Sequence, residues 1–259
     1  MGDTGIGAAS PPVRQGAVAA GAVALAAMTA AQVASGLRPG SVLLVAVVVL
    51  LLAGCAVAFT AAVSSWGAAA VAFCVVACVG LVAEWVGTRT GFPFGGYRYT
   101  DVLWPQTGGV PVIVALAWAG MGLAAYAVAP GEGPVRIGTG AAALTAWDLF
   151  LDPQMLRLGA WAWVEAGAYR GVPLSNFAGW LLVSAVVMAV IHAVVGRNAS
   201  GAVGLVGLYT VMAVMETVGF AAVFEPRDPL VAVVGGAAMG GFAVLAWKRR
   251  ADRNGAGRG

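Results

Sequence analysis

Charged residues and histidine are scarce in this sequence. Of its 259 residues, 10% are Asp, Glu, Lys or Arg, and His192 is the single histidine, whereas soluble domains carry roughly a quarter charged residues. So little charge excludes an ordinary soluble domain. The lone histidine lies near the end of an expected helix, 174–195, on the side of the membrane opposite to the acidic residues discussed below. We therefore expect it to be an interfacial or packed residue, which excludes Ser-His-Asp catalysis.

Cysteine is also rare. The three cysteines, Cys55, Cys74 and Cys78, all fall inside apolar segments, where cysteine usually acts as a small apolar side chain. No cluster of histidine and cysteine has the spacing of a metal site, so we expect no metal. The net charge of +3 comes largely from the terminal stretch "KRRADRNGAGR". It reports orientation in a membrane and gives no indication of nucleic-acid binding.

Apolar residues are abundant, at 61% of the chain. Runs of about 18 or more apolar residues, long enough to cross a bilayer, recur along the whole sequence. They predict an all-α, polytopic transmembrane bundle of about eight helices, or seven if the first is peripheral. The expected helices are 16–35, 41–63, 68–87, 109–129, 137–152, 174–195, 202–224 and 230–247. A leader at 1–15 is expected to be disordered, residues 16–247 form the transmembrane domain, and 248–259 form a basic cytoplasmic tail.

Two connections, 88–108 and 153–173, are longer than the others and rich in aromatic residues, Gly and Pro. With eight crossings, both fall on one side of the membrane and both termini on the other. Basic residues are somewhat more numerous on the side of the termini, which indicates that both termini are cytoplasmic. The expected location is the bacterial plasma membrane.

Four acidic residues lie within the expected helices: Glu84, Asp148, Asp152 and Glu216. A charged carboxylate at a helix centre costs roughly 2.5–3.5 kcal/mol on insertion scales, so each requires an explanation. They could be neutral and hydrogen-bonded, or paired with arginines of the loops, and so only hold helices together; the candidate arginines are Arg89, Arg98, Arg157 and Arg170. However, all four acids lie toward the half of the bilayer that the long loops cover, and Asp148 and Asp152 share one helix face. This convergence favours a functional site.

Aromatic residues gather in the same region. Seven of the nine tryptophans lie between residues 85 and 180. Some are expected to form an interfacial belt, and the others to line a cavity. A lipid-accessible cavity with carboxyl groups and aromatic faces is suited to acid catalysis on an alkene, because a carboxyl group can protonate the double bond and aromatic rings can stabilise the resulting cation.

Several stretches together resemble a known family: "EWVGTRTGFPFGGYRYT", "GVP", "ALAW", "DLFLDP", "GAWAW" and "GAYRGVPLSNFAGW". They are similar to the carotenoid biosynthesis family of membrane carotenoid hydratases, of the bisanhydrobacterioruberin hydratase and gamma-carotene hydratase type. The resemblance covers roughly residues 80 to 182. It rests on Glu84, Gly87, Gly91, Pro93, Phe94, Gly95, Tyr97, Tyr99, Asp148, Asp152, Pro153, Trp161, Gly171, Pro173, Asn176 and Trp180.

The resemblance implies addition of water across the terminal double bond of an acyclic (psi) carotenoid end group, giving a tertiary alcohol without a redox cofactor. It implies Asp148 or Asp152 as proton donor, Glu84 as the group that positions or deprotonates water, and Glu216 as support. The substrate-binding residues would be Phe94, Tyr97, Tyr99, Trp147, Trp161, Tyr169, Asn176, Phe177 and Trp180. The partners would be the carotenoid, membrane lipid and other enzymes of carotenoid biosynthesis. The segment "DVLWPQTGG" departs from the family pattern and leaves end-group specificity open.

Two other classes remain open. An intramembrane isoprenoid isomerase or cyclase would use the same cation, and a lipid carrier or channel would use none. A transporter is expected to show repeats or broken helices, and neither is evident in the sequence.

Overall fold

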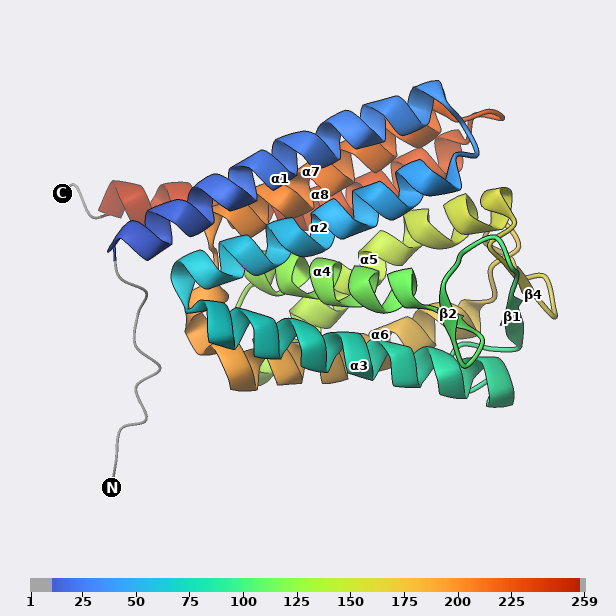
Figure 1. Cartoon of the computed structure of the whole chain (residues 1–259), viewed down its shortest axis with the longest axis horizontal. Coiled ribbons are helices and arrows are strands. Elements are labelled where there is room, and N and C mark those ends of the chain that lie inside the picture. The colour runs from blue at the N-terminus through green and yellow to red at the C-terminus, as the bar shows by residue number, and fades with distance from the viewer. Residues whose placement is uncertain (1–10, 257–259) are drawn as a thin grey trace.

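The structure is a computed structural model that describes residues 11–256. This part of the chain holds eight α-helices, coloured from blue to red in Figure 1. They are α1 (Pro11–Leu37), α2 (Val42–Val63), α3 (Trp66–Thr90), α4 (Val112–Val128), α5 (Gly133–Leu158), α6 (Leu174–Val195), α7 (Val203–Val218) and α8 (Pro229–Ala256). A 3-10 turn (Gly196–Ala199) follows α6, and a π-helical turn (Gly219–Val223) follows α7. The predicted all-α class and the eight helices are confirmed.

Six of the helices are long and apolar enough to cross a membrane: α1, α2, α3, α6, α7 and α8. The chain is therefore an integral membrane protein. Helix α4 has 17 residues, about 25 Å at 1.5 Å per residue. Helix α5 is long enough to cross but carries Arg136, Asp148, Asp152 and Arg157.

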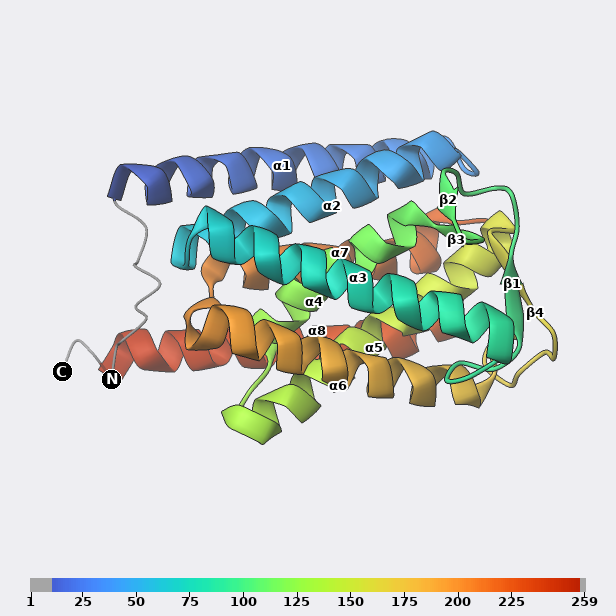
Figure 2. The ribbon, with the colours of Figure 1, turned by 60° about the horizontal axis from the view of Figure 1, so that its bottom comes forward.

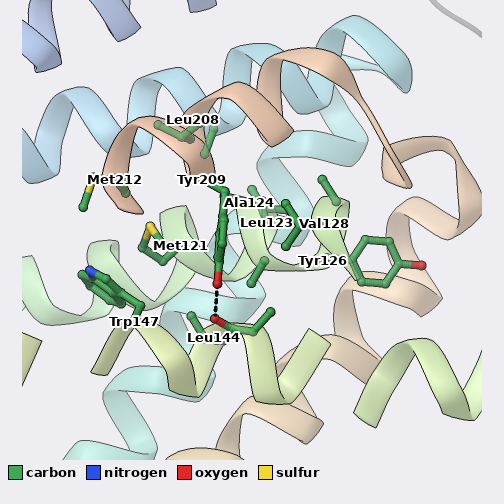
Figure 3. Packing of buried hydrophobic residues seen from close by; sticks show 14 of the residues in the cluster. Met121, Leu123, Ala124, Tyr126, Val128, Leu144, Trp147, Leu208, Tyr209 and Met212 are labelled. Atoms are coloured by element: carbon green, nitrogen blue, oxygen red, sulfur yellow. Dashed lines mark hydrogen bonds between the residues drawn. The ribbon is translucent and has the colours of Figure 1, made fainter. Parts of the chain in front are cut away.

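Helix α4 forms the centre of the bundle. Every residue from Ala117 to Val128 is buried, and the small side chains of this stretch let neighbouring helices approach closely. A Cβ atom on Gly120 would lie 2.9 Å from Leu52 of α2, and one on Gly122 would lie 3.0 Å from Val187 of α6. Figure 3 shows this core, where the Tyr209 hydroxyl donates a 2.8 Å hydrogen bond to the carbonyl of Ala143.

Helix α1 runs along the outside of the bundle, beside α2 (Figure 2). It begins at Pro11, so residues 11–15 of the expected leader are helical and the prediction of disorder is wrong for them. The rest of that leader, residues 1–10, lies outside the described residues. Helix α8 continues to Ala256, so the expected tail from residue 248 is helical to that point.

A glycine caps the C-terminus of α3 and of α5, where the two long loops begin. Gly91 (φ 76°) and Gly159 (φ 68°) adopt the left-handed conformation at these two helix C-termini, where glycine avoids the penalty of a Cβ atom. Strand β1 (Tyr97–Tyr99) lies in the first loop and strand β4 (Trp161–Trp163) in the second.

Strands β1 and β4 pair antiparallel, with Tyr97 opposite Trp163 and Tyr99 opposite Trp161. A small hairpin of β2 (Gln106–Thr107) and β3 (Val110–Pro111) completes the first loop. All these strands lie at one end of the bundle in Figure 1, and the start of α1 and the end of α8 lie at the other. The prediction that the two loops share a side is confirmed.

Candidate active site

Glu84 lies on α3, near the end covered by the loops, and is 5% exposed. Its carboxyl group accepts three hydrogen bonds. The hydroxyls of Tyr97 and Tyr99 donate to Oε2, the latter at 2.8 Å, and the indole N–H of Trp118 donates to Oε1 at 2.9 Å. Burial raises the pKa of both tyrosines, and the Glu84 carboxyl adds to this effect, so both phenols keep their protons and act as donors.

Asp148 and Asp152 lie one turn apart on α5 and are buried. The side-chain amide of Asn176, in the first turn of α6, donates to Oδ2 of Asp148 at 2.6 Å and to Oδ2 of Asp152. The indole N–H of Trp161 on β4 donates to Oδ1 of Asp152 at 2.8 Å. Oδ1 of Asp148 is buried without a hydrogen-bond partner. The predicted shared face of the two aspartates therefore exists, and one amide bridges it.

Glu84, Asp152 and Asn176 line the same small cavity, of about 20 Å³. We call it the carboxyl cavity. Its other wall residues are Phe94, Tyr97, Tyr99, Val114, Leu151, Trp161, Trp163 and Trp180. About 10–15 Å³ suffices for one water molecule. The carboxyl cavity is therefore the size of one water molecule and has several polar groups in its wall.

Aromatic rings enclose the carboxyl cavity. The rings of Trp118 and Trp180 stack with centroids 3.9 Å apart and planes inclined by 16°. Tyr99 and Trp161 meet edge to face at 5.6 Å across the pairing of β1 and β4. Ring faces carry negative potential, which suits them to stabilise a cation in this space.

Glycines on α3 admit these aromatic side chains. A Cβ atom on Gly87 would lie 2.8 Å from both the Phe94 ring and the Tyr97 hydroxyl, and one on Gly80 would lie 2.8 Å from the Trp118 side chain. These separations are shorter than Cβ contacts allow. The hydrogen bonds of Tyr97 and Trp118 to Glu84 thus depend on glycine at both positions.

Three of the four candidate arginines have other partners. Arg157 and Arg170 form ion pairs with Asp228, at 3.0 and 2.8 Å. Arg89 donates to the carbonyls of Trp85 and Gly108. Within residues 11–256, none of the ion pairs includes one of the four acidic residues in the helices. The hypothesis that arginines neutralise the four membrane acids is wrong for the described structure.

Glu216 does not reach the carboxyl cavity. It lies on α7 and lines a different, larger groove between α1, α2, α5 and α7, where Oε2 is buried without a partner. Trp147 lines that groove as well and also lacks a partner for its indole N–H. The expectation that all four acids converge is therefore wrong for Glu216.

Two predicted substrate-binding residues also lie elsewhere. Tyr169 donates to the carbonyl of Leu149 at 3.0 Å and meets Phe177 edge to face at 5.6 Å. Neither side chain lines the carboxyl cavity. By contrast Phe94, Tyr97, Tyr99, Trp161, Asn176 and Trp180 all do. His192 hydrogen-bonds to the Tyr126 hydroxyl at 2.8 Å, near the end of α6 remote from this cavity.

Trp118 and Trp163 belong to the site although neither was among the predicted site residues. Trp118 lies in the stretch "ALAW", which reads as an apolar helix. The available signal was its indole N–H, because a buried tryptophan usually finds a hydrogen-bond acceptor. For Trp163 the sequence offers no such signal, because its place in the site depends on the pairing of β4 with β1.

Comparison with known proteins identifies the family. Residues 45–242 match the family described as "Carotenoid biosynthesis protein". The chain belongs to this family. The family suggested by the sequence motifs is thus confirmed, over a longer span than those motifs covered. Every residue of the carboxyl cavity lies inside the matched span.

One relative is the bisanhydrobacterioruberin hydratase of Haloarcula japonica. It is 35% identical to this chain over 107 residues, which are 38% of this chain and 36% of the relative. The match thus spans little more than a third of the relative's length. No solved structure matches the chain.

Proposed function

We propose that this protein is a carotenoid hydratase. It would add water by acid catalysis across the terminal double bond of an acyclic end group and give a tertiary alcohol. The observation that carries the proposal is the carboxyl cavity, where two carboxyl groups, an amide and two phenols surround a space for one water molecule. Membership of the carotenoid biosynthesis family and the name of the archaeal relative support the choice of substrate.

Asp152 is suited to be the proton donor. It lines the carboxyl cavity, whereas Asp148 does not, and the Asn176 amide donates to both carboxyl groups. When two carboxyl groups share a site, repulsion disfavours the state in which both are ionised. None of the ion pairs in the described residues involves Asp148 or Asp152. The pair would therefore hold a proton, which Asp152 can deliver to the alkene.

Glu84 is suited to be the base. Three neutral donors contact its carboxyl group, an arrangement that stabilises the ionised form. In the proposed step, Asp152 gives its proton to the less substituted alkene carbon and the tertiary carbon becomes a cation. The water oxygen bonds to that carbon, and Glu84 accepts the released water proton. A proton returning from Glu84 to Asp152 through solvent would restore the site.

Isotope labelling tests this function. The protein, expressed in a host that accumulates lycopene, should yield a pigment heavier by one water molecule. Product made in deuterated, oxygen-18 water should carry one solvent deuterium beside the new alcohol and one solvent oxygen in it. An oxygen atom from O₂ would identify a hydroxylase and overturn the proposal. Solvent deuterium without added oxygen would identify an isomerase or cyclase.

We also propose that the protein lies in a bacterial plasma membrane with both termini in the cytoplasm. Its substrate, a carotenoid, is dissolved in the same bilayer. A role beside other enzymes of carotenoid biosynthesis is consistent with that location.

A further inference from the structure

A groove opens on the outer surface of the bundle between α1, α2, α5 and α7. We call it the lateral groove; its volume is about 250 Å³. Its walls are mostly aliphatic or methionine side chains. Four of its residues are also exposed on the outside of the bundle: Val33, Leu37, Val218 and Val223. Because the outer surface of these helices faces lipid, the lateral groove is open to the hydrocarbon of the membrane.

A smaller apolar cavity, of about 50 Å³, lies next to the lateral groove. The two share five wall residues: Val45, Val49, Trp147, Leu151 and Met155. This middle cavity in turn shares four with the carboxyl cavity: Val114, Leu151, Trp161 and Trp180. The three spaces therefore form a row, and Leu151 borders all of them.

Size requires a second binding space. The carboxyl cavity holds about one water molecule and cannot enclose even one isoprene unit. A long polyene that reacts there must therefore place its end group at the mouth of that cavity and the rest of its chain elsewhere. The row of spaces provides such a place, since most of its wall residues are apolar.

We infer that the lateral groove binds the body of a long acyclic polyene that enters sideways from the membrane. The end group reaches the carboxyl cavity through the middle cavity, past Trp147 and Leu151. This inference rests on the proposed function, because that function places the reacting end at Asp152 and Glu84. It assigns to α1 and α2 a role in holding the substrate.

Filling the lateral groove tests the inference. Val48→Trp adds a large side chain to a wall residue of α2 that lines the groove but neither inner cavity. We measure kcat/KM for lycopene and for a short acyclic isoprenoid alkene with the same end group. The ratio of long to short substrate should fall at least about tenfold, because only the long chain uses binding energy in the groove.

Val82→Trp is the matched control. Val82 is 59% exposed on α3 and lines none of the three spaces, so its ratio should equal that of the wild type. Ser35→Phe fills the groove from α1 instead, and serves if Val48→Trp does not insert. An unchanged ratio in the groove variants, or an equal fall in Val82→Trp, would overturn the inference. A wild type that hydrates neither substrate would overturn the proposed function and, with it, this inference.

Discussion

The four acidic side chains within the helices differ in their hydrogen-bond partners. Three of them meet polar donors around the carboxyl cavity or directly behind it: Glu84, Asp148 and Asp152. Glu216 lies among the aliphatic residues of the lateral groove and has an oxygen without a partner. Similar residue type and similar depth in the membrane thus lead to different chemistry.

Asp152→Asn should abolish most of the hydration. Asparagine keeps the shape and the contact with Trp161 but has no transferable proton, so turnover should fall at least about a hundredfold. The measurement is product formation per amount of inserted protein. Glu132→Gln is the control, since Glu132 is exposed and lines neither the carboxyl cavity nor the lateral groove, and it should stay within about threefold of the wild type. Equal turnover in the two variants would remove Asp152 as the donor.

The sequence predicts how deep each acidic residue lies in the membrane, but it does not predict the direction in which the side chain points within the bundle. Helical spacing correctly placed Asp148 and Asp152 on one face, because a four-residue separation is a local property. Grouping Glu216 with them failed because depth along α7 says nothing about how that helix is rotated within the bundle. The role of Trp118 was likewise hidden, since its acceptor, Glu84, lies on another helix.

At the scale of helices and loops, glycine on α3 leaves room for side chains of the first long loop to pack against that helix. Gly87→Ala should displace Phe94 and Tyr97, because the added Cβ atom would lie 2.8 Å from each. Loss of the Tyr97 contact to Glu84 should reduce hydration at least about tenfold while the protein still inserts. Gly54→Ala, where the Cβ atom meets nothing within 4 Å, should retain full activity. Equal activity in both variants would show that the Tyr97 contact is dispensable.

Asp228 joins three parts of the fold just before α8. Its carboxylate pairs with Arg157 at the end of α5 and Arg170 in the second long loop, and it accepts the N–H of Val231 at 3.2 Å. Burial acts to raise the pKa of Asp228. The Val231 N–H and the two arginines outweigh that effect, so its pKa lies below the usual value. Because the folded protein favours the ionised form, Asp228 stabilises the fold above the unfolded-state pKa of about 3.9.

Asp228→Asn should therefore lower stability at neutral pH by about 1–3 kcal/mol, the range for a helix cap combined with partly exposed ion pairs. The difference from the wild type should shrink as the pH falls through the pKa of Asp228. Thermal unfolding between neutral pH and about pH 3 measures this. Glu132→Gln removes an exposed ion pair with Arg197 at the opposite end and should have little effect. A difference that stays constant with pH would contradict the linkage.

Hydropathy located all eight helices, but it described their ends less well. Helices α5 and α8 run past the expected ends, to Leu158 and Ala256, because charged residues continue a helix that hydropathy no longer detects. The pairing of β1 with β4 was not predictable either. The two strands are about sixty residues apart, and strands of three residues have no periodicity to recognise.

At the scale of the whole molecule, the two ends of the bundle have different chemistry. One end carries the paired strands and the carboxyl cavity. The other holds the start of α1, the end of α8 and a basic cluster formed by Arg136, Arg249 and Arg253 around a cavity of about 280 Å³. An excess of basic residues marks the cytoplasmic side of membrane proteins. The end with the carboxyl cavity should then face away from the cytoplasm.

Cysteine labelling in intact cells tests this orientation. Thr107→Cys on the β2–β3 hairpin and Asn254→Cys near the end of α8 are both exposed positions at opposite ends of the bundle. A membrane-impermeant maleimide should modify Thr107→Cys in intact cells and Asn254→Cys only after lysis. The wild type, with Cys55 buried and Cys74 and Cys78 on the membrane-spanning helix α3, gives the background. The reverse pattern would place the carboxyl cavity near the cytoplasm and overturn the charge argument. Labelling of both variants in intact cells would mean that an even number of segments crosses the membrane between them, whereas five helices, α4 to α8, separate the two positions.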